Sequence, residues 1–151
     1  MFNETGYVMT MPAGKYYIGD LCYVMDDKEW DEFCGITIKD HKYLEGEFEM
    51  KDGRKFAVYG TMWGDGAYYS NIGTEHSVDS GSIGCIRVED IRANKYENIE
   101  SLGAVVEFKM PFTTEGGRNE LGRDWDGIIR IGNVMIETNS DGEYDDESEG
   151  Y

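Results

Sequence analysis

Residues 56–86 combine side chains that favour β-strands with closely spaced glycines, and no other segment restricts the fold as strongly. Aromatic and β-branched residues fit a pleated, half-buried surface, so we expect a strand from Phe56 to about Met62. Asp65-Gly66 tolerates positive φ angles, which predicts a tight turn and a returning strand through Tyr68 and Tyr69. The segment therefore predicts antiparallel β-structure.

A further turn at residues 71–73 precedes a strand at residues 76–80, which Gly81 interrupts. Because strand side chains alternate between faces, His76 and Asp79 point to opposite sides. A Ser-His-Asp triad needs side chains that converge, so neighbours on this strand are poorly placed to form one. Any partner of His76 must come from another strand.

The clearest hairpin pattern lies just before this segment. Residues 47–50 and 55–59 alternate apolar and polar side chains around Asp52-Gly53, a pair typical of tight hairpin turns. Charged residues on the outer face contribute a fraction of a kcal/mol each, so they favour solubility more than stability.

Both ends of the chain have weaker strand patterns. Residues 7–11 and 15–18 flank a Pro-Ala-Gly loop, which predicts a hairpin with a glycine-bearing turn. Residues 104–110 predict a strand, and residues 128–136 predict either a final strand or a tight hairpin across Gly132-Asn133.

One helix is expected, over residues 26–34. Asp26 can cap its N-terminus, and Glu29 completes a capping-box pattern three residues later. An apolar face through Trp30 docks it onto the sheet, and Gly35 suits the position after its C-terminus. A second, short helix is expected near Glu89. If Trp30 is buried, its replacement by Ala should cost about 3–5 kcal/mol.

These patterns predict a mostly β (α+β) fold: a curved antiparallel sheet, a sandwich or a partly open barrel, with one docked short helix. A chain of 151 residues can bury about two thirds of its unfolded surface, so it needs no disulfide or metal to fold. We expect one globular domain at residues 1–137 and a flexible acidic tail at residues 138–151. Three cysteines without a C-x-x-C motif indicate free thiols in a reducing cytosol.

The charge balance restricts the partners of the chain. It has 31 acidic residues against 14 Lys and Arg, a net charge of −17 and a pI near 4.3. Such a surface repels phosphate backbones and anionic lipids, so direct binding to nucleic acids or membranes is disfavoured. The acidic surface either serves solubility alone or binds a protein with a basic surface. No segment is long and apolar enough to span a membrane, and we expect a cytoplasmic protein.

The tail concentrates this charge. Residues 139–151 carry six acids and no base, which favours a disordered segment by default. Its alternative role is an arm that lies in a basic groove as a strand of phosphates would. The candidate partner-binding residues are Asp141, Glu143, Asp145, Asp146, Glu147 and Glu149.

A catalytic role has weaker support. No phosphate-binding loop, dinucleotide fingerprint, H-E-x-x-H motif or zinc spacing is present, and we expect no metal and no cofactor. The alternative is a hydrolase site formed by Asp20, Asp65, His76 and Asp79, with His76 as general base or metal ligand. A lone turn carboxylate such as Asp20 more often caps its own backbone.

A small-molecule pocket is the other alternative. Trp63, Tyr68 and Tyr69, together with the neighbouring glycines, form a possible pocket that stacks a base or nucleotide, as in a ligand-sequestering protein. Aromatic residues at alternate strand positions are more often part of the core.

Several motifs resemble a known group of proteins. They are the PAGKYYIGD run at residues 12–20 with Cys22-Tyr23-Val24, the GDGAY run at residues 64–68, and VDSGSIG at residues 78–84. The chain resembles, over about residues 11–92, a group of small tailed-phage and bacterial proteins without an established activity. Those relatives usually have Pro where this chain has Leu21. The resemblance implies a phage genome as the source.

Together these observations favour a non-catalytic, acidic interaction protein. We expect it to bind and inhibit or modulate a host protein with a basic surface, such as a nuclease or defence effector, by mimicking nucleic acid.

Overall fold

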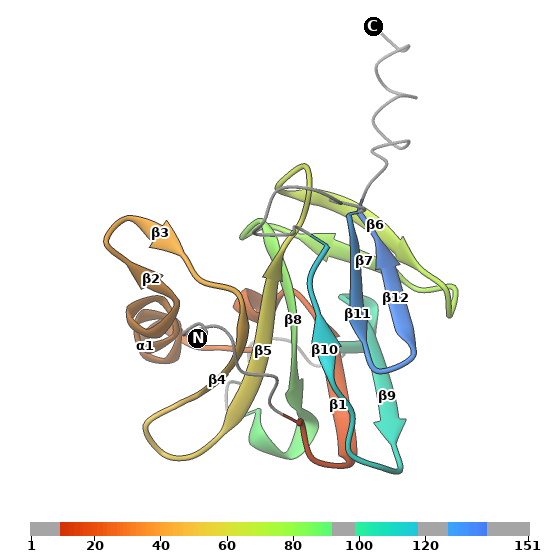
Figure 1. Cartoon of the computed structure of the whole chain (residues 1–151), viewed down its shortest axis with the longest axis horizontal. Coiled ribbons are helices and arrows are strands. Elements are labelled where there is room, and N and C mark those ends of the chain that lie inside the picture. The colour runs from red at the N-terminus through yellow and green to blue at the C-terminus, as the bar shows by residue number, and fades with distance from the viewer. Residues whose placement is uncertain (1–9, 92–98, 118–126, 139–151) are drawn as a thin grey trace, which may run out of the picture.

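The computed structural model describes residues 10–91, 99–117 and 127–138, and these form two five-stranded antiparallel sheets, a small third sheet and one α-helix (Figure 1). Sheet 1 has the strand order β4-β5-β8-β1-β9. Its strands are β4 (Gly46–Glu49), β5 (Lys55–Gly60), β8 (Ser82–Arg87), β1 (Gly14–Gly19) and β9 (Ala104–Phe108).

Sheet 2 has the order β10-β11-β12-β6-β7. Its strands are β10 (Thr114–Glu115), β11 (Ile128–Ile131), β12 (Val134–Glu137), β6 (Gly66–Ser70) and β7 (Glu75–Val78). The third sheet pairs β2 (Ile38–Lys39) with β3 (Lys42–Tyr43), directly after helix α1 (Asp27–Thr37). Three short 3-10 helices complete the described elements: η1 (Leu21–Tyr23), η2 (Val88–Asp90) and η3 (Ile99–Ser101).

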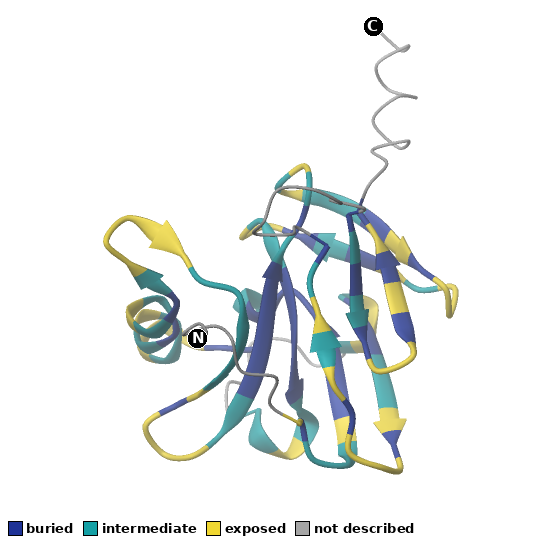
Figure 2. Ribbon diagram, viewed as in Figure 1, coloured by how far each residue is buried: buried dark blue, intermediate teal, exposed yellow. Residues whose placement is uncertain are grey.

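Strand β1 shows how the layers are built. Tyr16 and Ile18 lie in the core between the two sheets, whereas Tyr17 lies in a second core on the opposite face, beneath α1. Sheet 1 is thus covered on both faces, by sheet 2 and by α1. Its central strands are accordingly buried along most of their length (Figure 2). The predicted fold class is confirmed, in its sandwich form with one docked helix, and the described strands do not close into a barrel.

Helix α1 begins where the sequence predicts. The Asp26 carboxylate accepts the N–H of Glu29 at 2.8 Å, and the Glu29 carboxylate accepts the N–H of Asp26 at 3.0 Å, so the capping box is complete. The predicted end at Cys34 is wrong, because Gly35 lies inside the helix, which continues to Thr37. The Thr37 hydroxyl donates to the Phe33 carbonyl at 2.9 Å within this last turn.

The apolar face of α1 docks mainly through Phe33, which is buried and lies 5.2 Å from the ring of Phe56. Trp30 is only half-buried and stacks on Phe33 with ring centroids 4.4 Å apart. The predicted burial of Trp30 is therefore wrong in degree, and the expected cost of its removal falls below that of a core aromatic.

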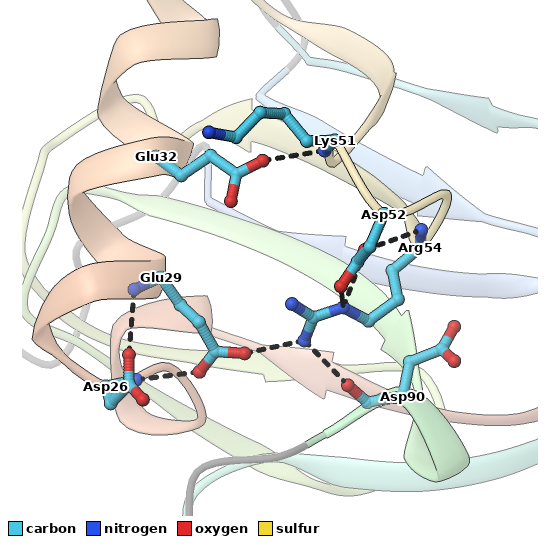
Figure 3. A network of polar contacts seen from close by, with 7 residues as sticks. All are labelled: Asp26, Glu29, Glu32, Lys51, Asp52, Arg54 and Asp90. Atoms are coloured by element: carbon cyan, nitrogen blue, oxygen red, sulfur yellow. Dashed lines mark hydrogen bonds and ion pairs between the residues drawn. The ribbon is translucent and has the colours of Figure 1, made fainter.

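A polar network fastens α1 to the turn between β4 and β5 (Figure 3). Arg54 donates from its Nη1 to Glu29 at 2.6 Å and to the Asp90 carbonyl at 3.1 Å, and from its Nε to Asp52 at 2.9 Å. Glu29 thus uses one oxygen for the capping box and the other for Arg54. The local helix start and the position of the helix on the sheet depend on the same carboxylate.

Two predicted hairpins are confirmed and two are not. Strands β4 and β5 pair around Gly53, which has φ +98°, and β11 and β12 pair across Gly132-Asn133. The expected pairing across residues 64–66 is wrong: β5 pairs with β4 and β8, whereas β6 pairs with β7 and β12 in the other sheet. The positive φ angles of Gly64 (+82°) and Gly66 (+150°) lie where the chain crosses between sheets.

The expected N-terminal hairpin is also wrong for its described part. Both edges of β1 are occupied, by β8 and β9, and Met11 instead forms a bridge to Phe112 with hydrogen bonds of 2.8 and 3.0 Å. Residues 7–9 of that prediction lie outside the described residues. The short helix expected near Glu89 is present as η2.

Candidate functional site

The carboxylate of Asp20 is a buried hydrogen-bond acceptor at the end of β1. Its Oδ1 accepts the N–H of Cys22 at 3.0 Å and the hydroxyl of Ser80 at 2.8 Å. Its Oδ2 accepts the N–H groups of Asp79 and Ser80, both at 2.7 Å. The expectation that Asp20 caps its own backbone is confirmed by the Cys22 contact. The contacts to residues 79 and 80, nearly sixty positions away, have no signal in the sequence.

Asp79 lies in an exposed turn, between the end of β7 and the start of β8. Burial, and then hydrogen bonding to the Asp79 side chain, raise the pKa of Tyr23 in η1 above its ordinary value. Asp20 and Asp79 are thus brought together, with both engaged in holding η1 against the turn.

His76 is fully buried on β7. Its Nδ1 lies 3.1 Å from the carbonyl oxygen of Ile18, so the neutral ring donates from Nδ1 to β1. Burial lowers the pKa of His76 from 6.5 to about 4, with the Ile18 bond opposing the shift. Its Nε2 is buried without a hydrogen-bond partner among the described residues. The predicted partner from another strand is confirmed, but it is a backbone carbonyl.

The four candidate catalytic residues do not converge. Neither ring nitrogen of His76 is hydrogen-bonded to a carboxylate among the described residues, and Asp65 is exposed in the crossing between the sheets. Within residues 10–91, 99–117 and 127–138, no group of three or more His, Cys, Asp and Glu side chains is placed to hold a metal ion. The arrangement supports an architectural role for Asp20 and His76.

The aromatic residues of the expected pocket are dispersed. Tyr68 is buried in the core between the sheets, and its hydroxyl donates to the Gly64 carbonyl at 3.0 Å. Trp63 and Tyr69 are about half exposed, at 53% and 50%. None of the three is among the residues that line the cavity described next.

A cavity of about 860 Å³ lies between α1, the β2–β3 hairpin and one end of sheet 1. Ligand pockets in proteins commonly have volumes of about 300–1,000 Å³. Half of the described residues that line it are apolar or aromatic: Trp30, Phe33, Cys34, Ile38, Tyr43, Leu44, Val58 and Met62. Glycines and short polar residues line the rest: Thr37, Gly60, Thr61, Gly64, Ser80, Gly81 and Ser82, with Glu45.

Sequence reasoning missed this cavity. The sequence predicts that the apolar face through Trp30 docks the helix onto the sheet, and it gives no sign of a cavity beside that face. Glu45 does not belong to any sequence motif. Its Oε2 accepts the N–H of Gly60, the last residue of β5, at 2.7 Å. Burial, and then Asp31, raise the pKa of the Cys34 thiol, so this cysteine is a poor nucleophile.

The tail residues proposed to bind a partner, from Asp141 to Glu149, lie outside the described residues. The described chain continues into the start of the predicted tail: Thr138 is buried, and its hydroxyl donates to the Gly127 carbonyl at 2.6 Å. None of the helices in the described chain has the length and apolar character to cross a membrane.

No protein-family model matches this chain, and no curated protein or solved structure matches it either. The fold and the geometry above define a mostly β sandwich with a docked helix and a cavity beside that helix. We therefore infer function from the arrangement of its own residues.

Proposed function

We propose that this chain is a non-catalytic binding protein whose acidic surface recognises a host protein with a basic, nucleic-acid-binding surface. The carrying observation is the net charge of −17, from 31 acids against 14 Lys and Arg. Charge of this size speeds encounter with a positive surface and disfavours approach to nucleic acids and anionic membranes. The proposal includes a phage genome as the source and the host cytoplasm as the location.

The engagement of the polar residues in the fold supports a binding role over catalysis. Asp20 has its four hydrogen bonds within the fold, and His76 is buried against a backbone carbonyl. A general base needs access to the proton that it removes. The alternative hydrolase site around Asp65, His76 and Asp79 therefore has no supporting geometry among the described residues.

In this proposal the chain blocks its partner by occupying the groove that normally holds nucleic acid. Exposed carboxylates on α1, such as Asp27 and Asp31, add to the six acids of the tail. Carboxylates and phosphates present the same charge to Lys and Arg side chains, so the two ligands compete.

The test starts from the full chain immobilised and exposed to a host lysate. We expect a basic protein to be retained, to be displaced by duplex DNA or RNA, and to lose affinity steeply as salt rises. A variant with the six tail acids changed to Asn or Gln should associate more slowly. The control variant neutralises four acids that are exposed on the sheets: Glu75, Glu107, Glu115 and Glu137. It should associate faster than the tail variant. The proposal is contradicted if neither salt nor nucleic acid reduces the retention. It is also contradicted if no basic protein is retained from the lysate.

A further inference from the structure

The threonine hydroxyls in the described wall of the cavity already use their hydrogens within the protein. Thr37 donates to the Phe33 carbonyl at 2.9 Å, and Thr61 donates to the Gly64 carbonyl at 2.6 Å. A hydroxyl has one hydrogen to donate and two lone pairs that accept. Toward a ligand, these two hydroxyls can therefore act only as acceptors.

The serine hydroxyls of the wall have the same direction. Ser80 donates its hydrogen to the Asp20 carboxylate at 2.8 Å, so it accepts from Ser82, whose Oγ lies 3.0 Å away. Ser82 thus donates to Ser80 and keeps its lone pairs. Because Asp20 is buried and Ser82 is half-buried, this relay fixes the Ser82 hydroxyl as an acceptor at the cavity wall.

A row of acceptors selects for a ligand that brings a donor. When a ligand displaces water from the cavity, an acceptor such as the Ser82 hydroxyl loses its hydrogen bond to that water. A ligand with an N–H or O–H group replaces the lost bond. A ligand of the same shape without a donor leaves the acceptor unsatisfied, and its affinity falls accordingly.

The apolar wall favours a flat ring. Trp30 and Phe33 stack with an angle of 12° between their planes, and Tyr43 adds a third ring to the lining. Aromatic rings attract one another in offset-stacked and edge-to-face arrangements, so an aromatic ligand gains ring contacts as well as apolar burial. Neither these contacts nor the acceptors depend on the charge of Glu45, whose Oε2 accepts the N–H of Gly60.

We propose that this cavity binds a neutral aromatic molecule that carries an N–H or O–H donor. The ring of the ligand lies beside Trp30 and Phe33, and its donor bonds to Ser82, which Asp20 orients through Ser80. The cavity volume of about 860 Å³ is in the range of sites for drug-sized ligands. This site goes beyond the proposed function and does not depend on it.

Three neutral probes test the chemistry. Indole has a ring and an N–H donor, benzofuran has the same shape with an oxygen in place of the N–H, and cyclohexanol has a donor without an aromatic ring. Backbone amide signals of the isotope-labelled full chain report where each probe binds, and Gly60, Gly64 and Gly81 line the cavity. We expect saturable shifts at these glycines with indole, about fivefold weaker binding of benzofuran, and weaker binding of cyclohexanol. The proposal is overturned if either of the other probes binds as tightly as indole, or if indole causes no saturable shift at these glycines.

A matched pair of variants tests the acceptor. Ser82→Ala removes the hydroxyl from the cavity wall, whereas Ser77→Ala makes the same change at a half-buried serine of β7 that does not line the cavity. We expect Ser82→Ala to bind indole about fivefold more weakly and benzofuran with unchanged affinity, so that the preference for indole disappears. Ser77→Ala should keep the preference. The unbound spectra show whether each variant is folded, and an unchanged preference for indole in folded Ser82→Ala, or an equal loss in both variants, also overturns the proposal.

Discussion

The carboxylate of Asp20 accepts hydrogen bonds from both the backbone N–H and the side-chain hydroxyl of Ser80, at 2.7 and 2.8 Å. This relationship joins the end of β1 in sheet 1 to the turn by which the chain returns from sheet 2. One buried side chain thus holds together two segments that are distant in the sequence, and it also orients the serine pair at the cavity.

Replacing Asp20 with Asn should destabilise the fold. The two side chains have the same shape, but each oxygen of Asp20 accepts at least one backbone N–H, so the NH₂ of Asn faces a donor in either orientation. We expect a loss of about 3 kcal/mol in the free energy of unfolding, measured with urea. Asp40→Asn is the control, because Asp40 is exposed and its φ of +52° suits Asn. Equal midpoints for the two variants would contradict the role of Asp20.

His76 should make stability depend on pH. Because its pKa is about 4 when folded and 6.5 when exposed, the unfolded chain binds more protons in this window. The contribution is therefore complete above pH 6.5 and is lost as the pH falls toward 4, with a total of about 3 kcal/mol. His76→Gln should flatten the stability profile between these values, measured by urea unfolding at several pH values. His41→Gln, at the exposed second histidine, should keep the wild-type slope; identical slopes for both variants would refute the assignment.

Arg54 should be sensitive to a conservative substitution. Its guanidinium contacts Glu29, Asp52 and the Asp90 carbonyl, and Lys cannot reproduce this fork. We expect Arg54→Lys to cost about 1–3 kcal/mol, because Arg54 and Glu29 are only 10% and 11% exposed. Arg87→Lys changes a pair with Glu89 that is far more exposed and should cost less than about 0.5 kcal/mol. Thermal unfolding of both variants measures this difference. A similar small loss of stability in each would show that the Arg54 network does not stabilise the docking of α1.

Replacing two different glycines with Ala should change the stability of the protein in opposite directions. A Cβ at Gly84 in β8 would overlap the carbonyl oxygen of Ala57 on the neighbouring strand, so Gly84→Ala should cost more than about 2 kcal/mol. Gly35 lies exposed inside α1 with nothing within 4 Å of such a Cβ. Gly35→Ala should stabilise the protein by up to about 1 kcal/mol. Denaturation midpoints that move in the same direction would contradict this contrast.

The predictions that hold depend on interactions between residues close in sequence. The capping box of Asp26 and Glu29 spans three residues, and the hairpin around Gly53 needs only alternation and a turn. The incorrect hairpin across residues 64–66 shows what such local patterns cannot predict. Alternation and glycines predict a turn there, but they do not say whether the flanking strands pair with each other. Here β5 already has β4 and β8 as neighbours, so β6 has its place in the other sheet.

The candidate site divides in the same way. Asp20, His76 and Asp79 were recognised from the sequence as groups with possible chemistry, and the helix face with Trp30 as apolar. In the tertiary structure, Asp20 and His76 are buried and form hydrogen bonds within the fold. A cavity lies beside Trp30. Glu45 and Ser82 reach that cavity from separate strands and turns, so no local pattern links them.

The amino-acid sequence alone determines the charge of this protein, the alternation that makes it mostly β, and the cap that starts its helix, because these depend on composition or on neighbours along the chain. Only the tertiary structure decides which strands share a sheet, which polar groups are buried, and where a ligand-sized space remains. Burial and hydrogen bonding depend on residues that the fold brings together from distant positions, such as Asp20 with Ser80.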